Sequence, residues 1–126
     1  MERADMAQSL VMELQGGRKV RMDFDMGALA YAEGVFEDRF GKSVGVDAII
    51  GDLVQGKSRA MMAFAYGAMM SAGERLTWEE FCKSVWTFAN YKRLSDAVTG
   101  ALVRMVHADD DAEGSAEKNA DSRGAG

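Results

Sequence analysis

The residues from Gly51 to Ser58 have the clearest chemical pattern in the chain. They read Gly-Asp-Leu-Val-Gln-Gly-Lys-Ser, which matches the phosphate-binding loop pattern Gly-x-x-x-x-Gly-Lys-Ser. In such a loop, backbone amides surround the phosphates of a nucleotide, the lysine reaches the outer phosphates and the serine hydroxyl binds magnesium. One alternative is therefore a small nucleotide-binding protein in which Lys57 and Ser58 hold the ligand.

A competing helical pattern runs through the same residues. Apolar side chains follow the spacing i, i+3, i+4, i+7 and i+8 at Val46, Ile49, Ile50, Leu53 and Val54. This spacing predicts a short amphipathic helix that turns both Leu53 and Val54 inward, away from any ligand. A phosphate-binding loop also belongs to a fold with a parallel sheet, and no convincing strand follows Ser58. We therefore favour the helix.

The other reactive residues lack the neighbours that catalysis needs. Cys82 lies on an apolar stripe and is expected to be a small buried hydrophobe. His107 is the only histidine, and it falls at the expected end of the last helix, where its charge suits the helix dipole. Glu79 and Glu80 are adjacent, so on a helix they point about 100° apart. We predict no catalytic centre, no metal site and no cofactor.

Methionine is abundant, with 10 in 126 residues. The candidate partner-binding residues crowd one apolar segment: Met61, Met62, Tyr66, Met69 and Met70. One interpretation is a core filled with flexible thioether side chains. The other is a surface that binds varied apolar partners, because thioethers repack easily, with Tyr66 and Tyr91 at its rim. The sequence leaves both interpretations open.

Composition narrows the class of protein. The length of 126 residues indicates one domain. The single cysteine excludes a disulfide within the chain and favours a reducing compartment. The net charge is −5. Basic residues are scattered, so nucleic acid is not an expected partner. The longest apolar run, residues 60–70, is too short to cross a bilayer, and residues 1–5 do not lead into a signal peptide. We expect a cytoplasmic protein that does not bind membranes.

Apolar periodicity predicts the elements that position these residues. Alternation over residues 10–14 and 20–24 predicts two strands, joined by a positive-φ turn at Gln15-Gly16-Gly17. Helical spacing predicts about five short helices packed around one apolar helix, at about 26–40, 46–54, 59–72, 78–89 and 91–106. The expected N-caps are Asp25, Ser58 and Thr77. The expected fold class is mainly α, with an N-terminal β-hairpin.

The ends of the chain differ in composition from its middle. Residues 1–7 are polar and are expected to fray. Residues 8–107 are expected to form a single helical domain whose hairpin covers 8–24. Residues 108–126 are an acidic tail without a large apolar side chain. Such a segment cannot offset its ordering entropy, so we expect disorder there.

Several segments together carry a resemblance to a known family. They are the run Lys19–Leu29, Glu33, Phe36–Gly41, Ser58–Gly67 and Leu76–Phe81. Over about residues 18–106 the chain resembles the tail assembly chaperones of long-tailed bacteriophages and gene transfer agents. The shared pattern is a basic–apolar strand that ends in Phe-Asp, a helix with a glutamate near an aromatic residue, an apolar helix, and a Leu-Thr-x-Glu-Glu helix start.

The resemblance implies a non-enzymatic function in phage tail morphogenesis. A member of this family binds the tape measure protein and keeps that long helical chain soluble while tail tube subunits polymerise around it. The implied partners are the tape measure protein, the tail tube protein and a second copy of this chain, in the host cytoplasm. An exposed hairpin edge would offer such partners a place to pair. The alternatives are a head–tail adaptor and the nucleotide-binding protein described above.

Overall fold

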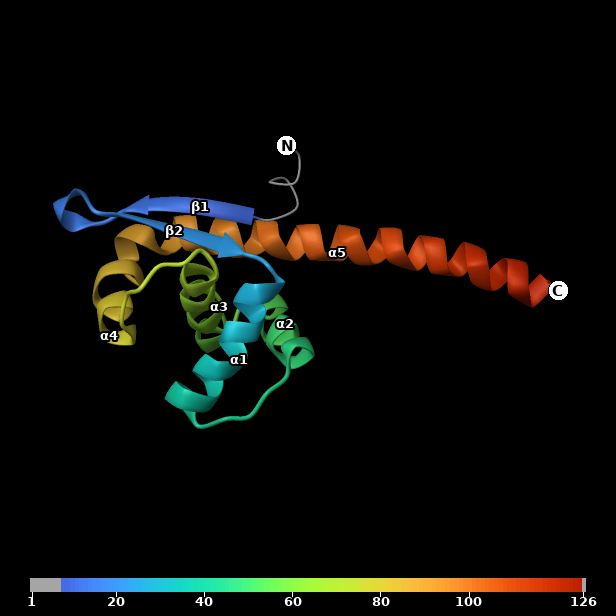
Figure 1. Cartoon of the computed structure of the whole chain (residues 1–126), viewed down its shortest axis with the longest axis horizontal. Coiled ribbons are helices and arrows are strands. Elements are labelled where there is room, and N and C mark those ends of the chain that lie inside the picture. Colours follow the sequence, from blue (N-terminus) through green and yellow to red (C-terminus); the bar gives the residue numbers. More distant parts are fainter. Residues whose placement is uncertain (1–7, 126) are drawn as a thin grey trace.

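The computed structural model describes residues 8–125. Within these residues the chain is mainly helical and carries an N-terminal antiparallel hairpin, which confirms the expected fold class (Figure 1). The elements are β1 (Gln8–Glu13), β2 (Lys19–Phe24), α1 (Met26–Phe40), α2 (Val46–Val54), α3 (Ser58–Ser71), α4 (Trp78–Glu80), a π-helical segment (Phe81–Val85) and α5 (Phe88–Ala125). The expected frayed segment, residues 1–7, lies outside the described residues.

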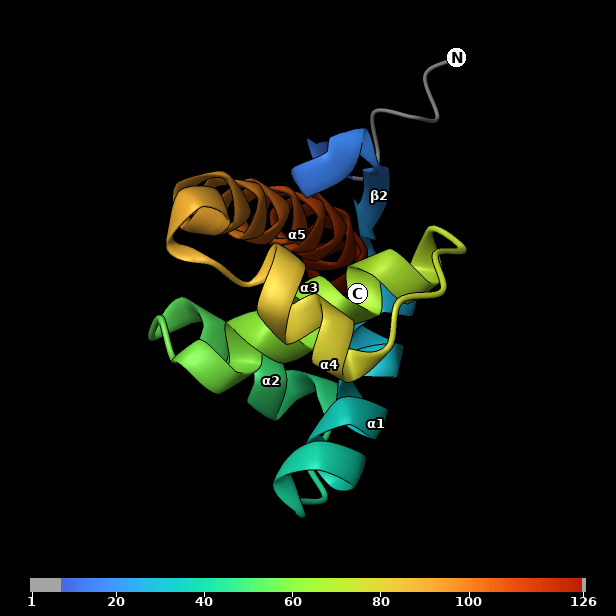
Figure 2. The ribbon, with the colours of Figure 1, turned by 90° about the vertical axis from the view of Figure 1, so that its left-hand side faces the viewer.

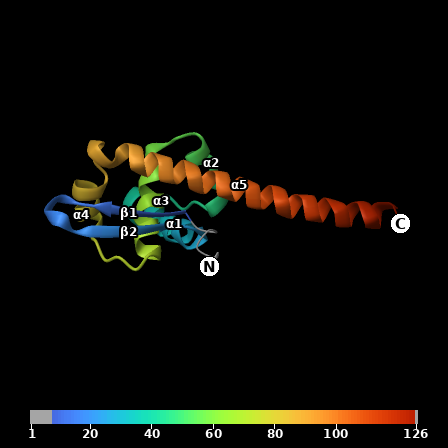
Figure 3. The same ribbon diagram turned by 90° about the horizontal axis from the view of Figure 1, so that it is seen from above.

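The hairpin is built as its alternating sequence predicts. β1 and β2 pair in the register Leu10 with Met22 and Val11 with Arg21. Gly16 and Gly17 supply the positive φ angles of the turn, 88° and 85°. The apolar face of the hairpin contributes Met12, Val20, Met22 and Phe24 to the core. The hairpin lies alongside the first part of α5 (Figure 3).

The apolar helix α3 is the centre of the fold. It lies between α5 and the hairpin on one side and α1 and α2 on the other (Figure 2). Its buried residues form most of one continuous core: Ala60, Met61, Ala63, Phe64, Ala65, Gly67, Ala68 and Met69. At Gly67 the backbones of α3 and α1 approach so closely that a Cβ atom would lie 2.3 Å from the carbonyl oxygen of Ala28.

The start of α1 is tied to the end of α3. The Asp25 carboxylate accepts hydrogen bonds from the Ala28 amide, 2.9 Å, and from the Ser71 hydroxyl, 2.8 Å. Asp25 is therefore the N-cap that the sequence predicts, and it also joins two helices. Gly41 ends α1 with a positive φ of 67°.

The fourth and fifth helices divide at a different residue from the one expected. The predicted capping box is present, because the Thr77 hydroxyl accepts from the Glu80 amide and the Thr77 amide donates to the Glu80 carboxylate. The helix then widens into the π-helical segment and breaks at Trp86 and Thr87, whereas the apolar stripe predicts a break near Asn90. The wider π turn shifts the stripe, so the helix ends earlier than the spacing indicates.

The backbone of α5 continues to Ala125 and extends away from the rest of the molecule (Figure 1). This differs from the tail without regular structure that we expect from residue 108. The segment contains no proline and several alanines, and both properties favour a helix. His107 consequently lies within α5 and not at its end. The division into a domain over 8–107 and an acidic tail stays a prediction.

Candidate binding surface

Residues 46–58 do not form a phosphate-binding loop. They fold as α2, a short turn and the first residue of α3, and Gly51 lies inside α2. Leu53 is buried as expected, but the expectation for Val54 is wrong. Val54 is 68% exposed, because α2 ends there and none of the elements over residues 8–125 covers its side chain.

Lys57 and Ser58, the two residues that would bind a nucleotide, have other positions in this structure. The Lys57 ammonium lies 3.5 Å from the Asp52 carboxylate. Ser58 is the first residue of α3, and the capping position belongs to Lys57, which offers no side-chain hydrogen bond. The expectation that Ser58 caps this helix is therefore wrong.

The five candidate partner-binding residues separate into two groups. Met61 and Met69 are core residues, with 5% and 0% of their surface exposed. Met62, Tyr66 and Met70 are half-buried and lie on the outer side of α3. The structure therefore gives Met61 and Met69 the role of core filling. Only the second group is accessible to a partner in this conformation.

Tyr66 belongs to a chain of aromatic contacts that crosses the molecule. From α1 the ring of Phe40 contacts Trp78, with ring centroids 6.0 Å apart, and Trp78 contacts Tyr66 at 5.3 Å. Tyr66 continues to Phe81 at 5.3 Å. Phe81 reaches Trp86 at 6.5 Å, and Trp86 contacts Tyr91 of α5 at 5.9 Å. We call these six residues the aromatic chain. Phe81 is fully buried, so it separates the accessible members into two groups. We call the group before it, the half-buried Phe40, Trp78 and Tyr66, the apolar strip.

Two arginines lie over this strip. The Arg59 guanidinium is 5.2 Å from the centroid of the Phe40 ring, and the Arg39 guanidinium is 5.8 Å from the centroid of the Trp78 ring. Both distances are within the range of a cation–π interaction. Arg39 also lies 3.7 Å from the Glu79 carboxylate. The strip is therefore apolar along its length and has positive charge at its α1 end.

The aromatic chain ends in a groove at the start of α5. The groove has a volume of about 530 Å³ and is lined by Ser58, Trp86, Thr87, Phe88 and Tyr91. Phe88 is 102% exposed, so its entire ring is in solvent, and Tyr91 is 47% exposed. Met62 follows Ser58 by one helical turn on α3, which joins this groove to the half-buried methionines. We call it the α5 groove.

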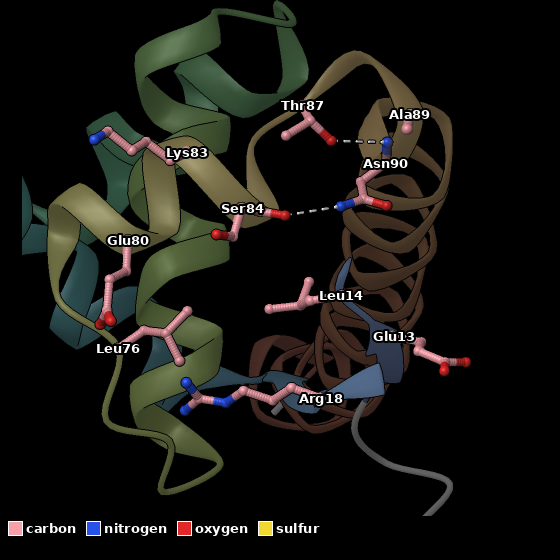
Figure 4. Close-up of a pocket in the computed structure, with 10 residues that line it drawn as sticks. All are labelled: Glu13, Leu14, Arg18, Leu76, Glu80, Lys83, Ser84, Thr87, Ala89 and Asn90. Atoms are coloured by element: carbon pink, nitrogen blue, oxygen red, sulfur yellow. Dashed lines mark hydrogen bonds between the residues drawn. The ribbon is translucent and has the colours of Figure 1, made fainter. Parts of the chain in front are cut away.

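The side chain of Asn90 fixes the corner that forms this groove. Its amide Nδ2 donates to the carbonyl oxygens of Ser84, 3.3 Å, and Val85, 3.2 Å, and so caps the π-helical segment (Figure 4). The Asn90 backbone amide donates to the Thr87 hydroxyl at 3.3 Å. These bonds hold Trp86 and Phe88 at a sharp turn between two helical segments. Asn90 is thus a positioning residue for the groove.

A second, more polar cavity is lined by Asn90 and shares Thr87 with the α5 groove. It measures about 510 Å³ and lies between the hairpin turn, the π-helical segment and the start of α5 (Figure 4). Leu14 and Leu76 line it together with both signs of charge, from Glu13, Arg18, Glu80 and Lys83. Arg18 points toward Glu80, whose carboxylate already accepts the Thr77 amide. This cavity contains no cluster that is typical of catalysis.

The pKa shifts indicate structural roles for three groups. Hydrogen bonding to the backbone of Thr77 is the main cause that lowers the pKa of Glu80. Burial raises the pKa of the Tyr66 hydroxyl, which donates to the Leu76 carbonyl oxygen at 2.8 Å. Cys82 is only half-buried, so the expectation of a fully buried side chain is wrong. Its partial burial still raises the pKa of the thiol, and the negative charge of Glu79 adds to this. The raised pKa disfavours a reactive thiolate at Cys82.

Both outer edges of the hairpin carry side-chain partners. The Arg93 guanidinium donates to the Val11 carbonyl oxygen at 2.9 Å, on the edge of β1. The Glu74 carboxylate accepts from the Arg21 amide at 2.8 Å, on the edge of β2. Val11 and Arg21 face each other in the register, so the middle of each edge is occupied. Pairing of a neighbour with a hairpin edge stays a prediction, and at these positions it would have to replace the two side-chain hydrogen bonds.

Among the described residues, no group of three or more histidine, cysteine, aspartate or glutamate side chains could hold a metal ion. Within the same part of the chain, no helix is long and apolar enough to cross a membrane. Comparison with family models, with curated proteins and with solved structures finds no match to this chain.

Proposed function

We propose that this protein is a non-enzymatic chaperone that binds the tape measure protein during phage tail assembly. The proposal rests on the sequence resemblance over residues 18–106 and on one structural observation, the exposed ring of Phe88 in the α5 groove. Burying a phenylalanine side chain contributes about 1.5–3 kcal/mol. Leaving it in water forgoes that stabilisation, which a bound partner would recover.

The geometry of the groove suits a helical client. An amphipathic helix docks by placing side chains at i, i+3, i+4 and i+7 into an apolar groove. The α5 groove and the half-buried side chains of Met62 and Tyr66 offer such a row of apolar contacts. Methionine adapts to differently shaped side chains, which fits a chaperone that meets many segments of one long chain. The proposal places the protein in the host cytoplasm.

The test is binding of tape measure segments by variants of the groove. Phe88→Ala is expected to weaken binding roughly thirtyfold, because a central aromatic anchor typically contributes about 2 kcal/mol or more. Met26→Ala is the matched control, since Met26 is also exposed, at 61%, but lies at the start of α1. Fluorescence titration and the soluble yield of a co-expressed tape measure protein are the readouts.

Two results would contradict the proposal. One is equal binding by Phe88→Ala and the unchanged protein. The other is retention of the protein in finished particles, which is expected of a head–tail adaptor and not of a chaperone. Lys57→Ala is expected to leave client binding intact, whereas a nucleotide-binding protein would lose its nucleotide with this substitution.

A further inference from the structure

The central helix α3 exposes one row of side chains along its length. Over residues 60–70 every residue of α3 is buried except Met62, Tyr66 and Met70, which are half-buried. The exposed Arg59 precedes them on the same side, because seven residues, close to two full turns, separate Arg59 from Tyr66. The row therefore begins with a cation and continues with apolar side chains.

This row connects the two apolar surfaces at the ends of the aromatic chain. Ser58, at the start of α3, lines the α5 groove. The next residue, Arg59, places its guanidinium over the Phe40 ring of the apolar strip. Tyr66 belongs to the same strip and contacts Trp78. A helix that covers both the groove and the strip therefore passes Arg59.

The charge of Arg59 is not balanced within the described part of the chain. The neighbouring cations have carboxylate partners, since Lys57 lies 3.5 Å from Asp52 and Arg39 lies 3.7 Å from Glu79. Among the described residues, no carboxylate lies within ion-pair distance of the Arg59 guanidinium. This surface consequently has one positive charge that a partner could neutralise.

The surroundings of Arg59 favour a carboxylate as that partner group. The Phe40 ring offers no hydrogen-bond acceptor to the guanidinium, whose five N–H groups form a fork that fits a carboxylate. Arg59 also lies in the first turn of α3, where the helix dipole is positive and the capping residue Lys57 offers no side-chain hydrogen bond. The dipole and the guanidinium thus attract the same sign of charge.

On the basis of the client binding proposed above, we infer that the client segment is an acidic amphipathic helix. Its apolar side chains, spaced i, i+3, i+4 and i+7, cover Met62 and Tyr66. A glutamate or aspartate one turn beyond these side chains accepts hydrogen bonds from Arg59. Arg59 thereby discriminates among apolar helices, because a lysine at the same position would bring two like charges together.

Three synthetic helical peptides measure this preference. They share one row of leucines and differ only at the positions four residues before and four residues after the row, which are both glutamate, both glutamine or both lysine. Changing both ends makes the result independent of the direction in which the helix docks. In fluorescence titrations we expect the glutamate peptide to bind about fivefold more tightly than the lysine peptide. High salt should reduce the difference.

Charge reversal at Arg59 shows whether this residue causes the preference. Arg59→Glu is expected to prefer the lysine peptide, and a glutamate in the first turn of α3 suits the helix dipole, so the fold is retained. Circular dichroism checks the fold. Arg75→Glu is the matched control, because Arg75 is also exposed but follows the other end of α3, and it should keep the preference for glutamate.

Four results would overturn the inference. They are no binding of any peptide, equal binding of all three by the unchanged protein, an unchanged order of affinities in Arg59→Glu, and tighter binding of the lysine peptide by the unchanged protein. The last result would identify the aromatic rings as a site for a cation.

Phe88→Ala separates this inference from the proposed function. If Phe88→Ala weakens the binding of tape measure segments while the three peptides bind alike, the groove binds its client without selecting for charge, and only the role of Arg59 is wrong. If Phe88→Ala also leaves the binding of tape measure segments unchanged, the proposed function is wrong as well.

Discussion

Substitution of Gly67 by alanine tests the close approach of α1 and α3. Alanine stabilises a helix interior by about 1 kcal/mol relative to glycine, so helix propensity alone predicts a more stable protein. At Gly67, however, the added Cβ would lie 2.3 Å from the carbonyl oxygen of Ala28 and 3.2 Å from the amide nitrogen of Ala32. These are backbone atoms that an α-helix pairs with each other, so neither can rotate away.

The size of the effect follows from the displacement that the methyl group requires. To restore an ordinary contact, α1 must retreat from α3 by roughly 1 Å, and a gap of that size forfeits a quarter to a half of each dispersion contact. Overpacking of this kind costs about 3 kcal/mol at the upper end of its usual range. After the gain in helix propensity is subtracted, we expect a net destabilisation of about 2 kcal/mol. The melting temperature should fall by about 8–16 °C.

The matched control is Gly34→Ala. Gly34 also lies inside a helix, α1, but nothing is within 4 Å of the position of its added Cβ. Here helix propensity acts alone, and we expect a gain of about 1 kcal/mol. Urea unfolding followed by circular dichroism measures both variants. If Gly67→Ala is as stable as the unchanged protein while Gly34→Ala shows its gain, the inferred contact between α1 and α3 is wrong.

Two further predictions concern the corner and the capping box. Asn90→Ala should destabilise the protein by about 1–2 kcal/mol, since two hydrogen bonds to Ser84 and Val85 are lost. Asn90→Asp should be worse because a carboxylate offers no donor, and unfolding by urea tests this order. Glu80 has a pKa below its unfolded value, so its stabilisation is present at neutral pH and is lost as the pH falls through the folded pKa. Glu80→Gln keeps the cap and should flatten this acid-side loss of stability; an identical pH profile would contradict it.

The fold was largely predictable because its signals are local. Alternation marks the hairpin, and Asp25, Thr77 and Gly41 mark helix ends by their side-chain chemistry or by their φ angle. The expectations fail where a helix ends or changes its number of residues per turn, because the spacing of apolar residues does not mark either change. The stripe of α2 includes Val54, although the helix ends there and leaves it exposed. The stripe after Thr77 passes into a π-helical turn, which changes its period.

The candidate site was predictable only in part. Tyr66 and Tyr91 were expected at its rim, and both belong to the aromatic chain. The expected site residues do not include Phe88, although it is the most exposed large apolar residue that the structure describes. A signal was available, since Phe88 does not fit the apolar stripe that runs from Leu94 to Met105 on the same helix. Met61 and Met69 are buried because segments distant in sequence pack against α3. The amino-acid composition does not show which segments pack together.

The hairpin edges decide which mode of partner recognition the fold leaves open. Adding a strand to β1 or β2 would require the new chain to displace Arg93 from Val11 or Glu74 from Arg21. Breaking a hydrogen bond to a charged group forfeits about 1.5–3 kcal/mol, and the arriving backbone must replace it before it gains anything. The α5 groove has no such cost, because Phe88 already lies in solvent. If the proposed client binds this protein, we therefore expect it to dock as a helix at the α5 groove and not as a strand added to the hairpin.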